Sequence, residues 1–123
     1  MSPNILIIED NEQNMYMLSY LLEQNNFNIL KAYNAIDGLK LAHEKHPEII
    51  LIDIQLPDMD GHELCVKLRH NGLPKETVII VVTSYAMGGD REKAIESGAN
   101  GYIEKPINPD TFISQMESVY NTK

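Results

Sequence analysis

Short, nearly continuous apolar runs limit the possible folds of this 123-residue chain more than its other features do. Three of these runs are rich in β-branched residues and occupy positions 5–8, 49–52 and 78–82. Runs without alternating polar residues are typical of strands that a parallel sheet buries on both faces. A weaker run at 101–103 and a further segment at 28–32 bring the number of expected strands to five. Helices must then cover both faces of the sheet.

The segments between these strands have the residue spacing of helices. Apolar residues recur every three or four positions in four of them, and in the remaining one Ala94 lies between Glu92 and Glu96. The recurring residues, which we expect to face the sheet, are Met15, Leu18, Leu22, Ile36, Leu39, Ala42, Leu64, Leu68, Phe112, Ile113, Met116 and Val119. Five strands alternating with five helices predict an α/β, doubly wound domain with a five-stranded parallel sheet.

Residues that favour helix ends lie where this alternation requires them. Capping residues and a proline of the first turn mark the starts of the second, third and fifth helices. These residues are Asn34 and Asp37, Asp60 and Gly61, and Asn108, Pro109 and Asp110. Gly72 and Gly98 are the expected helix stops.

The composition argues against several classes of partner. Eighteen acidic residues against ten Lys and Arg give a formal charge of −8 and a pI of about 4.8, which disfavours nucleic acid and anionic lipid surfaces. No apolar run approaches the roughly 20 residues that span a bilayer, and the first residues do not resemble a secretory signal. The single Cys65 fits a reducing compartment. We therefore expect one cytoplasmic domain over residues 1–123, without membrane or nucleic acid partners.

Polar residues directly follow four of the five expected strands. In chain order they are Glu9, Asp10, Asp53, Thr83, Ser84, Glu104 and Lys105. The strands of a parallel sheet all end at one edge, which is where open α/β sheets place their ligands. We therefore expect three acids, a hydroxyl group and an ammonium group to meet at this edge.

The acids that follow the first and third strands predict a metal site. In the strand order 2-1-3-4-5 these strands are neighbours, so Glu9, Asp10 and Asp53 lie close enough to repel one another. A divalent cation removes this repulsion most directly, and carboxylate oxygens suit Mg²⁺. Since Mg²⁺ usually keeps waters and substrate phosphate oxygens in its shell, the cluster favours a phosphoryl group as ligand.

Asp53 is the expected nucleophile at this edge. A carboxylate held beside Mg²⁺ and a lysine can form an acyl phosphate. Lys105 is placed to neutralise charge on the phosphoryl oxygens, and the Thr83 hydroxyl could donate a hydrogen bond to one of them. Taken singly, these residues are more typical of helix caps, turns or solvated side chains. The prediction depends on their joint placement at successive strand ends.

The order of these residues resembles the receiver domain of two-component response regulators. The resemblance covers essentially the whole chain and is most specific at residues 51–61, LIDIQLPDMDG, which look like the phosphoacceptor segment of that family. It implies a flavodoxin-like (CheY-like) fold with strand order 2-1-3-4-5. Within the family, the chain is most similar in type to single-domain DivK-like regulators or to the receivers of hybrid kinases.

The resemblance also implies roles for individual residues. Asp53 corresponds to the phosphorylated residue and metal ligand, Asp10 to a direct Mg²⁺ ligand, and Glu9 to a ligand acting through water. The backbone carbonyl of Gln55 would complete the protein ligands. The family commonly has an aspartate where this chain has Glu9, and this longer side chain could shift the metal or its water.

Three further positions carry roles in the switch. By resemblance, Thr83 is the switch hydroxyl, Tyr102 the switch aromatic residue and Lys105 the phosphate-binding cation. A cis peptide bond is expected before Pro106, as X-Pro bonds adopt cis most readily. Tyr85, two residues past Thr83, is expected to slow dephosphorylation.

The resulting functional hypothesis is a phosphorelay response regulator. A histidine kinase or histidine phosphotransfer protein would donate a phosphoryl group to Asp53 with Mg²⁺ as cofactor, and the change would alter binding to a downstream protein. Such a chain is a phosphoacceptor switch with at most slow autophosphatase activity rather than an enzyme. The alternative is a receiver fragment of a hybrid histidine kinase.

Two other protein classes fit the sequence less well. A flavodoxin-like flavin carrier needs a phosphate-binding loop after the first strand, where Glu9 and Asp10 would repel phosphate. A phosphatase with an aspartate nucleophile needs a second acid two residues later, and position 55 is Gln.

Overall fold

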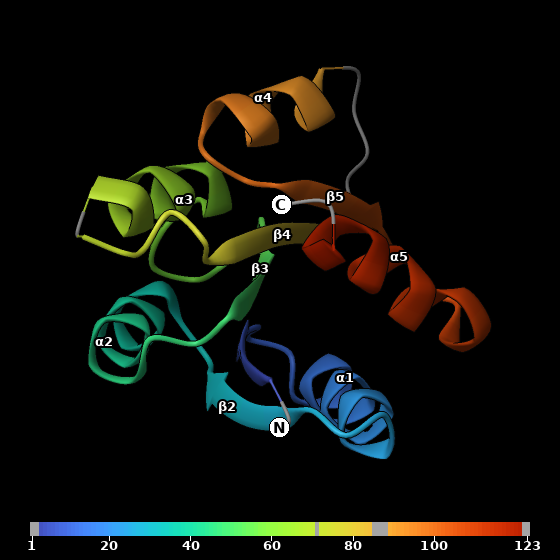
Figure 1. The fold of residues 1–123 in the computed structure, drawn as a ribbon. Helices are drawn as coiled ribbons and strands as arrows, with labels where there is room; N and C mark the ends of the chain where they lie inside the picture. Colours follow the sequence, from blue (N-terminus) through green and yellow to red (C-terminus); the bar gives the residue numbers. More distant parts are fainter. Residues whose placement is uncertain (1–2, 71, 85–88, 122–123) are drawn as a thin grey trace.

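The computed structural model describes residues 3–70, 72–84 and 89–121, and in these residues five parallel strands form one sheet (Figure 1). The strand order is β2-β1-β3-β4-β5, as expected for the doubly wound α/β class. The strands are β1 (Asn4–Ile8), β2 (Asn28–Ala32), β3 (Ile49–Asp53), β4 (Val78–Thr83) and β5 (Gly101–Glu104). The predicted fold class and strand order are confirmed.

In the described residues, four helices connect successive strands and a fifth follows β5, and together they cover both faces of the sheet. They are α1 (Glu12–Gln24), α2 (Ala35–Lys45), α3 (Gly61–His70), α4 (Asp90–Glu96) and α5 (Pro109–Asn121). Apolar residues of α1 and α5 pack on one face, and those of α2, α3 and α4 pack on the other (Figure 1). No helix in the described ranges has the length and apolar character that crossing a bilayer requires.

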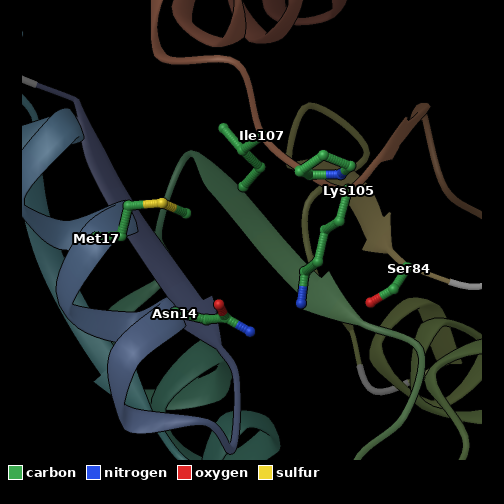
Figure 2. A pocket seen from close by; sticks show the side chains of 6 residues that line it. Asn14, Met17, Ser84, Lys105 and Ile107 are labelled. Carbon is green, nitrogen blue, oxygen red and sulfur yellow. The ribbon is translucent and has the colours of Figure 1, made fainter.

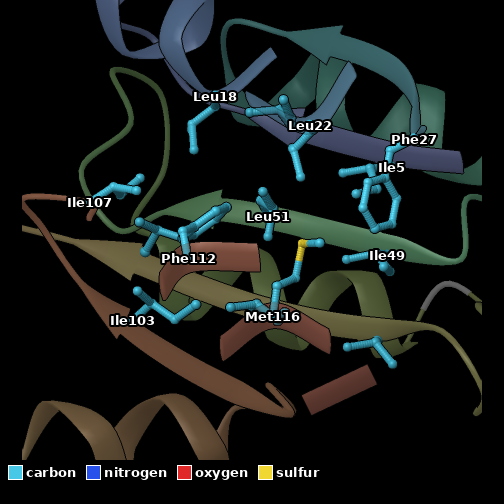
Figure 3. Packing of buried hydrophobic residues seen from close by; sticks show 14 of the residues in the cluster. Ile5, Leu18, Leu22, Phe27, Ile49, Leu51, Ile103, Ile107, Phe112 and Met116 are labelled. Carbon is cyan, nitrogen blue, oxygen red and sulfur yellow. The ribbon is translucent and has the colours of Figure 1, made fainter. Parts of the chain in front are cut away.

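The core lies on both sides of the sheet because successive strand residues point to opposite faces. Ile5 and Ile7 belong to the cluster under α1 and α5, whereas Leu6 and Ile8 belong to the cluster under the other helices. Figure 3 shows the first cluster, with α1 and α5 side chains meeting around Leu51 of β3. Burial on both faces explains why the strands read as unbroken apolar runs.

Helix α2 corrects one expectation. Ile36 is 62% exposed, so the prediction that it faces the sheet was wrong. The buried residues of α2 are Ala35, Gly38 and Ala42. The helix lies so close to β1 that a Cβ atom on Gly38 would collide with the Ile8 side chain. Small residues therefore form the contact face, and the large Ile36 side chain lies outside it.

The predicted helix starts are observed. Asn34 caps α2, because its side-chain oxygen accepts a hydrogen bond of 2.8 Å from the N–H of Asp37. Helix α3 begins at Gly61 and α5 at Pro109, where the Asn108 side chain accepts a 2.9 Å bond from the N–H of Asp110. These starts place the loops between strands and helices at the carboxyl edge of the sheet.

Candidate functional site

The turn after β1 carries the first two acids of the site. The N–H of Glu9 donates to the carbonyl of Ala32 (3.0 Å), which extends the alignment of β1 with β2 beyond its last residue. Glu9 is buried and Asp10 is exposed. Oε2 of Glu9 accepts from the N–H of Asn11 (3.2 Å), and Asn11 in turn caps α1. The start of α1 thus fixes the Glu9 side chain.

The loop after β3 holds Asp53 beside this turn. Ile52 lies opposite Ile8 in the register of β3 and β1, so the residues that follow both strands emerge together. The N–H of Gln55 donates to Oδ1 of Asp53 (3.3 Å). The loop closes where the N–H of Gly61 donates to the carbonyl of Ile54 (2.8 Å). A Cβ on Gly61 would lie 2.9 Å from the Asp53 carbonyl oxygen, so glycine permits this closure.

The structure brings the three predicted acids together. Glu9, Asp10 and Asp53 each offer a carboxylate oxygen, and these oxygens lie within 4.8 Å of one another. Oxygen ligands of this kind suit a hard divalent cation such as Mg²⁺. The acidic cluster therefore fits a metal site.

Lys105 reaches this cluster from the loop after β5. Its Nζ lies 2.8 Å from Oε1 of Glu9 and 3.8 Å from Oδ2 of Asp53. Figure 2 shows its side chain extending toward the end of β3. The N–H of Lys105 donates to the Thr83 carbonyl (2.7 Å), and the following bond to Pro106 is cis. The sequence placed Lys105 at this edge but did not predict its close pairing with Glu9.

The cluster changes the acidity of Asp53. Its pKa rises from the ordinary value of 3.8 to about 6, chiefly because burial disfavours the charged form. Repulsion from Glu9 and a side-chain hydrogen bond with Glu9 raise the pKa further, whereas Lys105 and the N–H of Gln55 lower it. Without a metal ion, one ammonium group does not compensate three carboxylates. The site favours an additional cation.

Two other predicted residues, Thr83 and Tyr102, lie on the neighbouring strands β4 and β5. Thr83 is fully buried at the end of β4, where it is paired in register with Glu104. Tyr102 of β5 packs against the core under α2, α3 and α4, and its hydroxyl group is buried without a hydrogen-bond partner among the described residues. Burial raises the pKa of Tyr102, and the charges of Asp90 and Glu104 add to this effect.

A cavity next to the acidic cluster extends the sequence prediction. A cavity of about 530 Å³ opens beside the ammonium group of Lys105 (Figure 2). Its lining comes from α1 and from the loops after β4 and β5, and consists of Asn14, Met17, Ser84, Lys105, Pro106 and Ile107. The helical spacing of Met17 gave no sign of this position. Tyr85 lies outside the described residues.

Asp58 is a residue whose connection the sequence did not predict. It lies in the loop between β3 and α3, and its carboxylate accepts hydrogen bonds from the backbone of α2. An aspartate after a proline is an ordinary turn residue in sequence, and no local pattern links Asp58 to Ala35 across a separation of 23 positions.

Comparisons with known proteins agree with this geometry. Residues 5–117 match the family model of the response regulator receiver domain. The polar-differentiation response regulators DivK of Brucella ovis and Brucella anthropi are each 36% identical over 118 residues, which cover 96% of this chain and 96% of theirs.

Solved structures show the same likeness. A CheY-like response regulator receiver domain protein from Methanospirillum hungatei matches with a TM-score of 0.91 and 29% identity, over 99% of this chain and 96% of that chain. The chemotaxis protein CheY4 of Vibrio cholerae has the same fold, with a TM-score of 0.91 at 24% identity over 97% and 99% of the two chains. The chain therefore belongs to the receiver domain family of response regulators.

Proposed function

We propose that this receiver accepts a phosphoryl group on Asp53 from a phosphohistidine of a histidine kinase or phosphotransfer protein. The observation that carries this proposal is the convergence of three carboxylates within 4.8 Å, with the Lys105 ammonium 3.8 Å from Asp53. This arrangement offers one nucleophilic oxygen in a site that can neutralise the charge of a phosphoryl group. The same proposal treats residues 1–123 as one receiver domain acting in the cytoplasm, where the lone Cys65 would stay reduced.

The chain offers the ligands for Mg²⁺. Asp10 and Asp53 would bind it directly, the Gln55 carbonyl would add a neutral oxygen, and Glu9 would act through water. In this chain both Glu9 oxygens already accept hydrogen bonds, from Lys105 and from the N–H of Asn11, which supports an indirect role. When bound, Mg²⁺ supplies charge neutralisation for the phosphoryl oxygens.

The transfer forms one bond and breaks one bond. An oxygen of the Asp53 carboxylate attacks phosphorus, and the P–N bond of the donor breaks with its electron pair leaving on the imidazole. The product is an acyl phosphate on Asp53. Lys105 would stabilise the transferred charge, and the Thr83 hydroxyl would donate a hydrogen bond to a phosphoryl oxygen. The chain acts as a phosphoacceptor switch, with at most a slow autophosphatase activity, rather than as an enzyme with turnover.

Phosphorylation would then change the binding of a downstream protein. The dianion draws the Thr83 hydroxyl toward it, and Tyr102 on the neighbouring strand moves into the space that becomes free. Support comes from the adjacency of β4 and β5 and from the buried Tyr102 hydroxyl, which has no hydrogen-bond partner in the part of the chain that the structure describes. The surface formed by α4, β5 and α5 would change as a result.

The direct test is intact-mass spectrometry after incubation with acetyl phosphate and Mg²⁺. We expect the wild-type chain to gain the mass of one phosphoryl group and Asp53→Asn to gain none. Addition of EDTA should prevent labelling of the wild type. Labelling of Asp53→Asn to the same extent would contradict the assignment of the acceptor.

The switch is tested separately with Tyr102→Ala. This variant should be labelled at Asp53 like the wild type, but phosphorylation should produce smaller changes in the NMR amide signals of α4, β5 and α5. Loss of labelling as well would show that Tyr102 supports the fold or the site rather than the switch.

A further inference from the structure

The carboxylate of Asp58 joins the loop after β3 to the first turn of α2. Its Oδ1 accepts a hydrogen bond from the N–H of Ala35 (2.8 Å), and its Oδ2 accepts one from the N–H of Ile36 (3.0 Å). The first N–H groups of a helix have no partners within the helix, so an acceptor placed there stabilises it. Both oxygens of one side chain are used across two distant segments.

The same loop carries residues of the proposed metal site. Gln55 follows Asp53 by two residues and donates its N–H to Oδ1 of Asp53. Gln55 and Asp60 form an isolated antiparallel bridge, and the bond from Gly61 to Ile54 closes the loop at its base. The base is thus fixed on β3. Asp58, near the tip, fixes the other end of the loop on α2.

The first turns of α2 also support the turn that carries the other acids. Ala35 is fully buried, and Gly38 packs so closely on Ile8 that a Cβ atom would force the Ile8 side chain to move. Ile8 is the last residue of β1 and directly precedes Glu9 and Asp10. The amino-terminal part of α2 therefore contacts both segments from which the three carboxylates come.

We propose that Asp58 is a positioning residue that holds the loop of Asp53 and Gln55 in register with Glu9 and Asp10 through the amino end of α2. The inference rests on the proposed function of this site, and it adds a residue that touches neither metal nor phosphoryl group. Residues that orient metal ligands from outside influence affinity because the ligands must keep their mutual geometry.

The electrostatics of Asp58 agree with this role. The N–H donors of Ala35 and Ile36 lower the pKa of its carboxyl group, so it is ionised at neutral pH. A negative charge is favourable at the positive end of a helix dipole. The loop is thus attached by two charge-assisted hydrogen bonds, which are stronger than neutral ones.

A matched pair of variants separates positioning from ordinary helix capping. Asp58→Ala removes both bonds between the loop and α2. Asn34→Ala removes the two hydrogen bonds between Asn34 and Asp37 at the same helix end, but leaves the bonds of Asp58 in place. Both variants lose a cap of α2, so both should lower the melting temperature by similar amounts.

The measurement is Mg²⁺ affinity by isothermal titration calorimetry, together with the rate of labelling by acetyl phosphate. We expect Asp58→Ala to bind Mg²⁺ about tenfold more weakly and Asn34→Ala to stay within about twofold of the wild type, as expected for loss of an outer residue that orients ligands. Asp58→Asn keeps one acceptor oxygen and should recover part of the affinity, and it carries the test if Asp58→Ala does not fold.

The outcomes distinguish the inference from the proposed function. If the wild type binds Mg²⁺ and is labelled at Asp53, and the Asp58 variants match it in affinity and rate, the positioning role is overturned and the function stands. Equal loss of affinity in Asn34→Ala and Asp58→Ala would reduce Asp58 to a helix cap and also overturn it. A wild type that neither binds Mg²⁺ nor is labelled would overturn the proposed function itself.

Discussion

At the amino ends of β4 and β5 a single guanidinium group meets neutral acceptors, whereas at the carboxyl ends of β1 and β3 one ammonium group pairs with two of three clustered carboxylates. Arg69 donates to the carbonyls of Gly98 (3.0 Å) and Thr77 (2.9 Å) and to Oδ1 of Asn100 (2.7 Å). Its hydrogen bonds thus join α3 to the segments that precede β4 and β5. At the other end, burial and then repulsion from Glu9 raise the pKa of Asp53.

This difference shows that the unbalanced charge of the two regions lies at the carboxyl end of the sheet. Burial lowers the pKa of Arg69, but three acceptors within the chain compensate for the lost hydration. The acids have only Lys105 as a cationic partner in the described part of the chain, which leaves an excess of negative charge for a ligand to neutralise. At the amino end of the sheet, hydrogen bonds within the chain satisfy the charged group, whereas the carboxyl end keeps an excess of negative charge.

The largest expected effect in a test of this contrast between the two ends of the sheet is on the reactivity of Cys65, which lies one turn before Arg69 on α3. Cys65 is fully buried, and burial raises the pKa of its thiol from 9.0 to about 12. Because the thiolate is the reactive form, the folded protein should react with Ellman's reagent about 10³-fold more slowly than the chain in urea. Equal rates in the two states would show that this region is open.

The next effect is the loss of the bonds of Arg69. Arg69→Met should lower the free energy of unfolding by about 3 kcal/mol, since the acceptors of buried Thr77, half-buried Gly98 and exposed Asn100 all lose a donor. Urea denaturation measures this change. Labelling of Asp53 by acetyl phosphate should keep its rate, because Arg69 lies at the opposite end of the sheet. A stable variant with slow labelling would contradict the separation of the two ends.

A matched control for this variant is Arg69→Lys. It keeps the positive charge but lacks the planar group that reaches three acceptors at once. It should therefore lose most of the stability that Arg69→Met loses. If Arg69→Lys were as stable as the wild type, charge rather than hydrogen bonding would explain the role of Arg69.

At the carboxyl end, removal of a charge should stabilise the protein. Asp53→Asn should raise the free energy of unfolding of the metal-free chain by about 1 kcal/mol at pH 7. This value is smaller than the free energy that corresponds to the full change in the pKa of Asp53, because solvent screens the site. Urea denaturation in EDTA measures the difference. Lower stability of Asp53→Asn would contradict the view that the acids repel one another.

The pH dependence of the free energy of unfolding tests the same destabilisation by the Asp53 charge. Because the pKa of Asp53 is raised from 3.8 to about 6 in the folded state, the folded protein binds a proton that the unfolded chain releases in this interval. The contribution of Asp53 to stability is therefore present at low pH and decreases as pH rises from about 4 to 6. We expect the difference between wild type and Asp53→Asn to shrink toward pH 4.

The smallest effect is expected for an ion pair at the surface. Lys67 and Glu63 lie 4.0 Å apart on α3, and both side chains are about half exposed. Lys67→Ala should change the free energy of unfolding by less than about 0.5 kcal/mol in urea denaturation. If Lys67→Ala lowered the free energy of unfolding as much as Arg69→Met, net charge rather than burial of the charged group would determine the stability of this helix.

Local sequence patterns predicted much of the fold, and together with the strand order they also predicted the cluster of three acids. The apolar runs before Glu9 and Asp53 predicted two buried strands, and parallel strands bring the residues that follow them to one edge. The exposure of Ile36 was not readable, because Ile36 and Ala35 both satisfy a helical spacing. Only the close contact between Gly38 and Ile8 selects the face that is buried.

The sequence by itself determined the alternation of strands and helices, the direction of the strands and the set of polar residues at their ends, because periodicity and chain direction are local properties. The tertiary structure alone decided which of these residues are partners. Lys105 and Glu9 are 96 positions apart, and Asp58 and Ala35 are 23 apart, yet each pair makes a hydrogen bond of 2.8 Å. Such contacts depend on how closely whole helices and strands pack, and no spacing along the chain encodes that distance.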